Sequence, residues 1–152
     1  MKKYFLSILC VVLGFCLTGI SSAQPFPMKF QWHDSLSSAR KQAAETGLPI
    51  VILFTGSSWC PSCVKLEKEV LCKKEFERAM NGTAIGVKLE FSMKDLDKSQ
   101  EYRDFRVMGV PSMIVIDAGG RELGRIGYVP GQTPAQYVKF FKKCTPRVLA
   151  SK

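Results

Sequence analysis

Cys60 and Cys63, with two residues between them, lie in the stretch SSWCPSCVKL, residues 57–66. This spacing occurs in metal sites, in structural disulfides and in redox couples. A structural zinc site needs four ligands, but the chain has a single histidine, His33, and no second closely spaced cysteine pair. A copper(I) site would be expected to include a nearby histidine or methionine, and neither is adjacent to the cysteine pair in the sequence. A disulfide across so short a loop would stabilise the fold little. The pair is therefore best interpreted as a redox couple without a metal.

The pair lies between two segments of different pattern. Residues 48–54, LPIVILF, form a continuous apolar run that predicts a strand buried on both faces. From Pro61 onward apolar residues recur at helical spacing, with Cys63 on the apolar face. Cys60 is thus expected between the carboxyl end of a strand and the start of a helix. That junction is the usual functional edge of an α/β sheet.

Cys60 is expected to be the N-cap of this helix, with Pro61 at the first helical position. The free amides of Ser62 and Cys63 would then point toward the Cys60 sulfur and favour its thiolate form. Cys63, covered by the helix, would resolve the mixed disulfide that Cys60 forms. Trp59 either covers the apolar side of the sulfur or packs in the core, and one role does not exclude the other.

The remaining chain alternates helical and extended patterns. No internal repeat or second domain is evident, and the elements alternate as expected for a three-layer α/β sandwich with a mixed β-sheet. Helices are predicted at about 34–46, from 61, at 75–80, 96–105 and 133–144, and strands at 48–54, 83–91 and in a hairpin around 118–120.

Residues 1–23 have the parts of a secretory signal: two lysines, an apolar stretch and small residues that end at Ala23. We expect cleavage after Ala23, with an uncleaved anchor as the alternative. Residues 24–33 then form an N-terminal tail, residues 34–145 the domain and residues 146–152 a C-terminal tail. The protein is therefore expected to be periplasmic or secreted, where disulfides persist.

The chain has a formal net charge of +9, and its basic residues are scattered among acidic ones. Such mixing is typical of a solvated surface rather than of a basic binding patch. No stretch resembles a nucleic-acid-binding module, so no nucleic-acid partner is expected.

Two further motifs accompany the cysteine pair. In RVMGVPSMIVID, residues 106–117, Pro111 directly precedes a predicted strand, and Gly127 lies in the final strand. Together with WCPSC these motifs resemble the thioredoxin superfamily over about residues 30–145. The pattern FTGSxWCxxC is most similar to exported bacterial members, the DsbH-like and DsbD C-terminal-domain-like disulfide interchange proteins.

The resemblance implies roles for matching residues. Cys60 and Cys63 match the redox pair, and Pro111 matches a cis-proline beside it, the alternative being an ordinary trans proline at the start of a strand. The Val110 backbone would pair with an extended substrate segment. Gly127 matches a glycine that lets the substrate approach.

One departure from the family concerns the proton of Cys63. Thioredoxins carry a buried aspartate in the central strand that helps to move this proton, but here no acidic residue lies between Gly47 and Cys60. Lys88 occupies the place of the partner lysine. Glu67, Glu90 or water must serve as base, and the sequence leaves this choice open.

Cys72 and Cys144 fall near the ends of two helices that the resemblance places on the same face of the sheet. A second, structural disulfide between them is one interpretation. Two separate, partly buried thiols are the default expectation.

The resemblance and the site together predict an exported, monomeric thiol–disulfide oxidoreductase that acts on protein disulfides, with no cofactor beyond the Cys60–Cys63 disulfide. Pro61-Ser62 supplies no histidine to stabilise the thiolate, which favours the reducing direction. A reductase outside the cytoplasm needs electrons, so a DsbD-type membrane reductant is implied by the resemblance. The alternatives are a protein disulfide isomerase and a redox-inert thioredoxin-like binding module.

Overall fold

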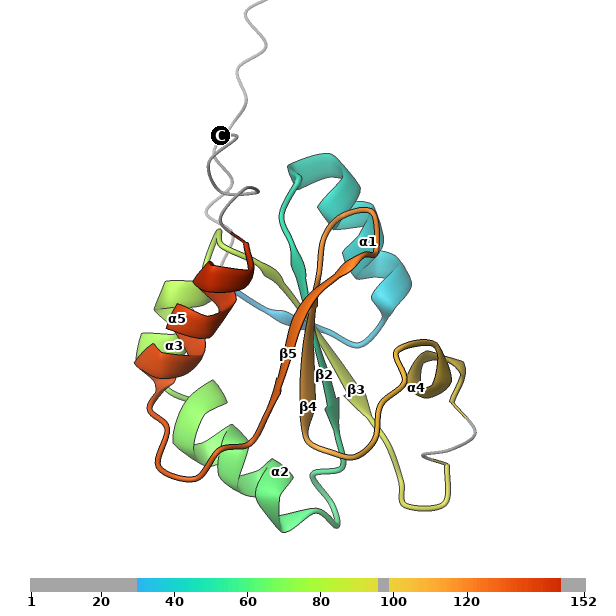
Figure 1. The fold of residues 1–152 in the computed structure, drawn as a ribbon, viewed down its shortest axis with the longest axis vertical. Coiled ribbons are helices and arrows are strands. Elements are labelled where there is room, and N and C mark those ends of the chain that lie inside the picture. The colour runs from blue at the N-terminus through green and yellow to red at the C-terminus, as the bar shows by residue number, and fades with distance from the viewer. Residues whose placement is uncertain (1–29, 96–98, 146–152) are drawn as a thin grey trace, which may run out of the picture.

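The computed structural model describes residues 30–95 and 99–145. These residues form a five-stranded mixed sheet in the order β1-β3-β2-β4-β5, with helices on both faces (Figure 1). The elements are β1 Trp32–His33, α1 Leu36–Thr46, β2 Ile50–Thr55, α2 Pro61–Leu66, the π-helix η1 Glu67–Leu71, α3 Lys74–Met80, β3 Ile85–Glu90, α4 Gln100–Asp104, β4 Ser112–Ile116, β5 Glu122–Gly127 and α5 Pro134–Cys144.

The central strand β2 connects the parallel and antiparallel parts of the sheet. It pairs in parallel with β3 and antiparallel with β4, and β5 continues antiparallel from β4. All six residues of β2 are buried, as the continuous apolar run predicts. The carboxyl ends of β2 and β3 and the start of β4 therefore meet at one edge of the sheet.

The helices form the two outer layers. The segments α2, η1, α3 and α5 cover one face, where Val70, Phe76 and Phe141 belong to a core cluster with Leu53 of β2 (Figure 1). On the opposite face α1 and the segment around α4 cover a second cluster that includes Phe54. The predicted three-layer α/β sandwich with a mixed sheet is therefore confirmed.

Helix boundaries follow the expected capping residues. Ser35 precedes α1 as its N-cap, and Gly47 ends the helix with a φ of 69°, a left-handed conformation that suits glycine. At the start of α5 the backbone N–H of Thr133 donates to the Gln136 side chain at 2.7 Å, which is half of a capping box.

An N-terminal tail was predicted at residues 24–33, but the last two of these residues form a strand of the sheet. Trp32 and His33 form β1, which pairs in parallel with Gly86 and Val87 of β3. A Cβ atom at Gly86 would lie 2.8 Å from ring atoms of both Phe30 and Trp32, so this strand packs directly over a bare backbone. Two residues are too few to show a strand period, which is why sequence patterning missed β1.

The helix after the cysteine pair changes type partway along. α2 continues without a break into η1, where the Cys72 N–H donates to the Glu67 carbonyl five residues earlier at 2.9 Å. The predicted apolar face is correct, because Cys63, Leu66 and Val70 are all buried. The π-helical turn was not predicted.

The predicted signal segment 1–23 and the C-terminal tail 146–152 lie outside the described residues. Within residues 30–95 and 99–145, none of the helices combines the length and the apolar character needed to cross a bilayer.

Replacing Phe141 by alanine should lower the free energy of unfolding by about 3–5 kcal/mol, because it removes a core side chain that connects α5 to α3. Phe141 is 1% exposed, and its ring centroid lies 6.2 Å from that of Phe76. Urea denaturation followed by circular dichroism measures the change. The exposed neighbour Lys142→Ala is the control and should alter stability by less than about 0.5 kcal/mol. An equal loss in both variants would contradict the packing argument.

Candidate redox site

Cys60 caps α2 through its sulfur. The Cys63 N–H donates to Cys60 Sγ at 3.2 Å, and Pro61 occupies the first turn of the helix. The Ser62 hydroxyl lies 3.3 Å from the same sulfur, so Ser62 contacts Cys60 through its side chain, and the donation expected from its backbone N–H stays a prediction. The two cysteines are joined by a disulfide, with Cα atoms 5.3 Å apart. An amide donor at a helix start favours a negative sulfur once this bond is reduced.

The two cysteines differ in exposure. Cys60 is 5% exposed and Cys63 is 1% exposed. Cys60, at the start of α2, is thus slightly more accessible than Cys63, which lies within the helix. Such a difference agrees with a redox pair in which one sulfur attacks and the other resolves.

The segment before β4 lies against the cysteine pair. The Val110–Pro111 peptide bond is cis, as the resemblance implies, and the Val110 carbonyl oxygen lies 3.6 Å from Cys60 Sγ. Pro111 is buried, whereas Val110 is half-buried. The backbone of Val110 is thus next to the Cys60 sulfur.

Gly127 lies beside this segment, because it pairs with Ser112 across β4 and β5. A Cβ atom at Gly127 would lie 3.2 Å from the Pro111 carbonyl oxygen, which is a tight contact. The Tyr137 hydroxyl donates to the Gly127 carbonyl at 3.1 Å and accepts from the Val129 N–H at 2.9 Å. The local sequence pattern gave no sign of this hydrogen-bonding role of Tyr137.

Trp59 is held in place by two contacts. Its indole Nε1–H donates to the Phe91 carbonyl at 2.8 Å. A Cβ atom at Gly56 would lie 2.5–2.6 Å from three atoms of the ring, so the indole packs on a glycine backbone. The half-buried ring therefore helps to fix the loop between β2 and α2, and Trp59 belongs to neither of the two core clusters.

Arg125 of β5 holds the chain that leads into the cis-proline segment. Its guanidinium donates to the carbonyls of Phe105 and Arg106 at 3.1 and 3.3 Å, and it forms an ion pair with Glu122 at 2.6 Å. The hydrogen bonds from Arg125 to Glu122 lower the pKa of the Glu122 carboxyl. Arg106 has a φ of 48°, an uncommon conformation for a residue other than glycine.

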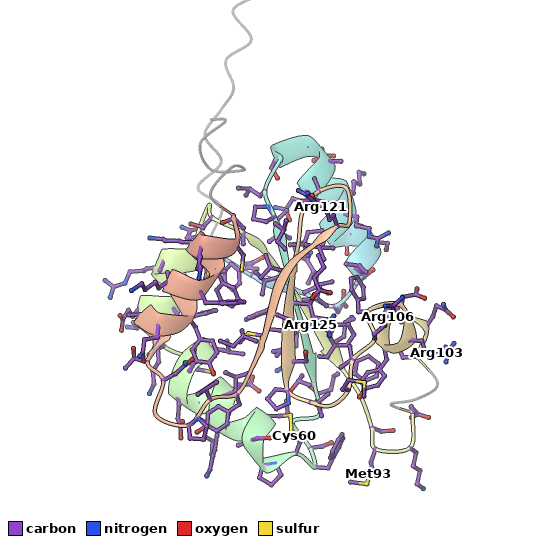
Figure 2. All side chains as sticks on the ribbon, viewed as in Figure 1. Cys60, Met93, Arg103, Arg106, Arg121 and Arg125 are labelled. Atoms are coloured by element: carbon purple, nitrogen blue, oxygen red, sulfur yellow. A yellow bond between two sulfur atoms is a disulfide. The ribbon has the colours of Figure 1, made fainter. Side chains whose placement is uncertain are left out.

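The exposed methionines are near the site and were not predicted. Met93 is 67% exposed and Met108, three residues before Pro111, is 95% exposed. Figure 2 shows Met93 at the same end of the molecule as Cys60, far from Arg121 at the opposite end. Flexible thioether side chains suit contacts with varied partners.

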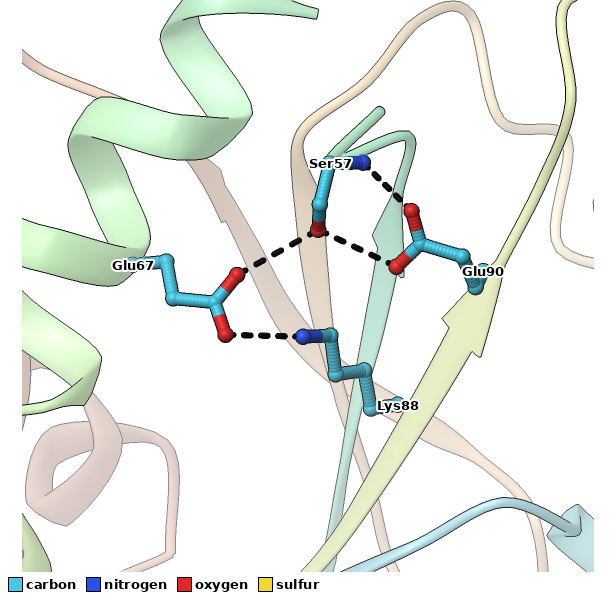
Figure 3. Close-up of polar contacts among 4 residues, drawn as sticks. All are labelled: Ser57, Glu67, Lys88 and Glu90. Carbon is cyan, nitrogen blue, oxygen red and sulfur yellow. Dashed lines mark hydrogen bonds and ion pairs between the residues drawn. The ribbon is translucent and has the colours of Figure 1, made fainter. Parts of the chain in front are cut away.

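A polar network lies next to the pair (Figure 3). Lys88 Nζ is 2.8 Å from Glu67 Oε1. Ser57 Oγ lies 3.2 Å from Glu67 Oε2 and 3.1 Å from Glu90 Oε2, and the Ser57 N–H donates to Glu90 Oε1. Both carboxylates named as candidates for the proton step, Glu67 and Glu90, thus belong to one network, and Ser57, which sequence reasoning missed, connects them.

Cys72 and Cys144 are not joined in the structure. Cys72 is an exposed free thiol and Cys144 a half-buried one. The Cys144 sulfur packs against β5, since a Cβ atom at Gly124 would lie 2.6 Å from it. Burial raises the pKa of the Cys144 thiol. This arrangement agrees with two separate thiols.

Among the residues that the structure describes, no cluster of three or more histidine, cysteine, aspartate or glutamate side chains could hold a metal ion.

The fold and the cysteine site agree with the comparison to protein families. The family model of the thioredoxin-like domain matches residues 36–142. This chain therefore belongs to the thioredoxin-like domain family.

Two curated proteins show which members of this family the chain is similar to. The disulfide bond reductase DsbH of Chlamydia pneumoniae is 32% identical over 108 residues, which cover 66% of this chain and 64% of the relative. The thioredoxin-related protein DsbJ of Chlamydia pneumoniae is 30% identical over 110 residues, or 67% of this chain and 31% of that relative. The match thus spans less than two thirds of the length of either curated relative.

A solved structure of a DsbH oxidoreductase superposes with a TM-score of 0.68 at 30% identity, and the match covers 78% of this chain and 86% of that chain. The chain is a DsbH homologue that carries a CxxC pair at disulfide distance.

Replacing Gly56 by alanine should displace the Trp59 indole, because the new methyl group would overlap the ring. We expect a lower melting temperature and a shifted Trp59 indole N–H resonance in the ¹H–¹⁵N NMR spectrum. Gly109→Ala is the matched control, since a Cβ atom there meets nothing within 4 Å. Unchanged spectra in Gly56→Ala would show that the indole does not depend on this contact.

Proposed function

We propose that this protein is an exported thiol–disulfide oxidoreductase that reduces disulfides in protein substrates. The observation that carries the proposal is the environment of Cys60: its sulfur accepts the Cys63 N–H at 3.2 Å and lies 3.6 Å from the Val110 carbonyl oxygen, and the residue is slightly more exposed than Cys63. Similarity to a disulfide bond reductase of Chlamydia pneumoniae supports the same activity.

The reaction proceeds in two exchanges. The Cys60 thiolate attacks one sulfur of the substrate disulfide, forms a mixed disulfide and releases the other substrate sulfur as a thiolate. The Cys63 thiolate then attacks Cys60, which closes the Cys60–Cys63 disulfide and releases the second substrate thiolate. The substrate gains two electrons and two protons, and the cysteine pair loses them.

The segment around the pair holds the substrate. The Val110 backbone pairs with an extended substrate chain, and Gly127 leaves space for it. Met93 and Met108 add exposed apolar surface at this end of the molecule. Contacts of this kind depend on backbone and on flexible side chains, so they accept substrates of varied sequence.

The cysteine pair itself stores the two electrons, so the proposal includes no further cofactor. Each turnover leaves the pair oxidised, and a DsbD-type membrane reductant in the periplasm would restore the dithiol. The protein acts as a monomer on folded or partly folded proteins, since the site is complete within one chain. Nucleic acid has no part in this proposal.

Substitution of the two cysteines separates the two exchanges. Cys60→Ser should abolish insulin reduction, because it removes the attacking thiolate. Cys63→Ser should accumulate the mixed disulfide, which mass spectrometry detects as an adduct on Cys60. The exposed Cys72→Ser is the control and should keep full activity. Insulin reduction that persists unchanged in Cys60→Ser would end the proposal that Cys60 is the attacking thiolate, and a wild-type protein that does not accelerate insulin reduction would favour the redox-inert binding module.

The reduction potential tests the direction of electron flow. Because Pro61-Ser62 carries no cation between the cysteines, we expect a value nearer the thioredoxin potential of about −270 mV than the strong-oxidant potential of about −120 mV. Equilibration in glutathione buffers, with thiol alkylation as readout, measures it. A value above the midpoint of that range would instead point to an oxidase or an isomerase.

A further inference from the structure

The Ser57 hydroxyl lies between two carboxylates. Its oxygen is 3.2 Å from Glu67 Oε2 and 3.1 Å from Glu90 Oε2 (Figure 3). A hydroxyl carries one hydrogen, so it donates to one of these oxygens only. The other contact becomes a hydrogen bond when that carboxyl group holds a proton. The geometry therefore suits a network that shares one added proton.

The sheet positions this network at the edge where Cys60 lies. Lys88 and Glu90 are two residues apart in β3 and thus share one face of the strand. Lys88 pairs in register with Leu53, which belongs to the core cluster beneath α2 and η1. The side chains of Lys88 and Glu90 therefore extend toward the helical segment that carries Glu67.

Glu67 connects this network to the resolving cysteine. It lies four residues after Cys63 in the continuous helical segment, and its N–H donates to the Cys63 carbonyl. Residues four apart share one face of a helix. Cys63 is 1% exposed, whereas the Glu67 side chain is 34% exposed and Glu90 is exposed. Glu67 is thus the member of the network that shares a helical face with a cysteine that solvent barely reaches.

We propose that Glu67 accepts the proton of Cys63 in the resolving exchange and that Ser57 relays a proton from Glu67 to Glu90. This role rests on the proposed thiol–disulfide exchange. The resemblance assigns the movement of this proton to an aspartate of the central strand. Residues 48–59 contain no acid, so here the proposal assigns it to Glu67 of the helical segment and Ser57 of the loop. Lys88 holds the carboxylate in position through Oε1.

The proton balance closes over the exchange. Cys63 gives its proton to Glu67 and becomes the thiolate that attacks Cys60. Glu67 then passes a proton to the Ser57 oxygen as the Ser57 hydrogen moves to Glu90, which releases it to water. The electrons stay with the sulfurs: one S–S bond forms within the protein and the bond to the substrate breaks. Reduction of the pair by its reductant returns the proton.

The groups on the other side of the segment take no part in this route. Glu69 of η1 accepts a hydrogen bond from the Tyr128 hydroxyl at 2.7 Å, and this bond raises the pKa of Tyr128. The charged neighbours of Glu67 in the described contacts are Lys88 and, through Ser57, Glu90. Glu69 therefore offers a matched control of the same residue type in the same helical turn.

The test follows the two exchanges separately with dithiobis(nitrobenzoate). In a Cys72→Ser parent, attack by Cys60 releases one nitrothiobenzoate, and displacement by Cys63 releases a second in a later phase. Cys63→Ser identifies that phase by lacking it. Both rates are measured from pH 5 to pH 9 in the parent, in Glu67→Gln, Ser57→Ala and Glu90→Gln, and in the control Glu69→Gln.

Glu67→Gln should slow the second phase by about 100-fold at neutral pH, because general base catalysis is lost. Its rate should then rise about tenfold per pH unit, since hydroxide replaces the carboxylate as base. Ser57→Ala and Glu90→Gln should slow the same phase by roughly tenfold, as Glu67 keeps its role without the relay. The first phase and Glu69→Gln should match the parent.

A second phase in Glu67→Gln with the rate and pH profile of the parent would overturn the proposal, as would equal slowing in Glu69→Gln. If circular dichroism shows that Glu67→Gln does not fold, Ser57→Ala and Glu90→Gln carry the test, and parental second phases in both overturn it. A parent with no first phase would instead refute the proposed thiol–disulfide exchange itself.

Discussion

The antiparallel pairing of β2 with β4 is the constraint on which the site depends. Phe54, next to the end of β2, pairs with Ser112, the first residue of β4. The loop that carries Cys60 and the segment that carries Pro111 therefore emerge from the same edge, although they are far apart in the sequence. A shift of one residue in this register would turn every side chain of β4 to the other face of the sheet. The buried residues on both faces of β2 and β4 oppose such a shift.

Within this frame the two sulfurs acquire different properties from their surroundings. The helix start supplies an amide donor to Cys60, and the body of the same helix covers Cys63. The chemistry of the pair thus follows from where a helix begins rather than from any special residue between the cysteines. Buried thiols cannot exchange protons freely with water, so a partly exposed network beside Cys63 complements the covered sulfur.

Local patterns were sufficient to predict most of the fold. The apolar run of β2, the glycine that ends α1 and the hairpin of β4 and β5 each follow from short-range physical rules. The cysteine pair and the proline before β4 are contiguous motifs, and the family resemblance that they carry predicted the location of the site. The strand β1 is too short to show a period, and η1 depends on a hydrogen-bonding pattern that residue types do not encode.

The polar contacts of the site escaped prediction because they join distant parts of the chain. Ser57 meets Glu90 across 33 positions, and the Tyr137 hydroxyl reaches back to Gly127 across 10. Glu67 and Glu90 could be named as candidates from the resemblance, because Glu67 follows Cys63 closely and Glu90 lies near Lys88 in the sequence. Their connection through one hydroxyl appears only when the strand register and the helix orientation are both known.

The ion pair between Glu122 and Arg125 has a second effect through its location on β5, the outermost strand of the sheet. An open strand edge invites pairing with other chains, and charged side chains on it discourage such association. The same guanidinium that secures the loop before Met108 therefore also keeps foreign strands from extending the sheet at β5. Under the proposed function, this protection favours docking of a substrate chain at the Val110 backbone beside Cys60 rather than at the edge of β5.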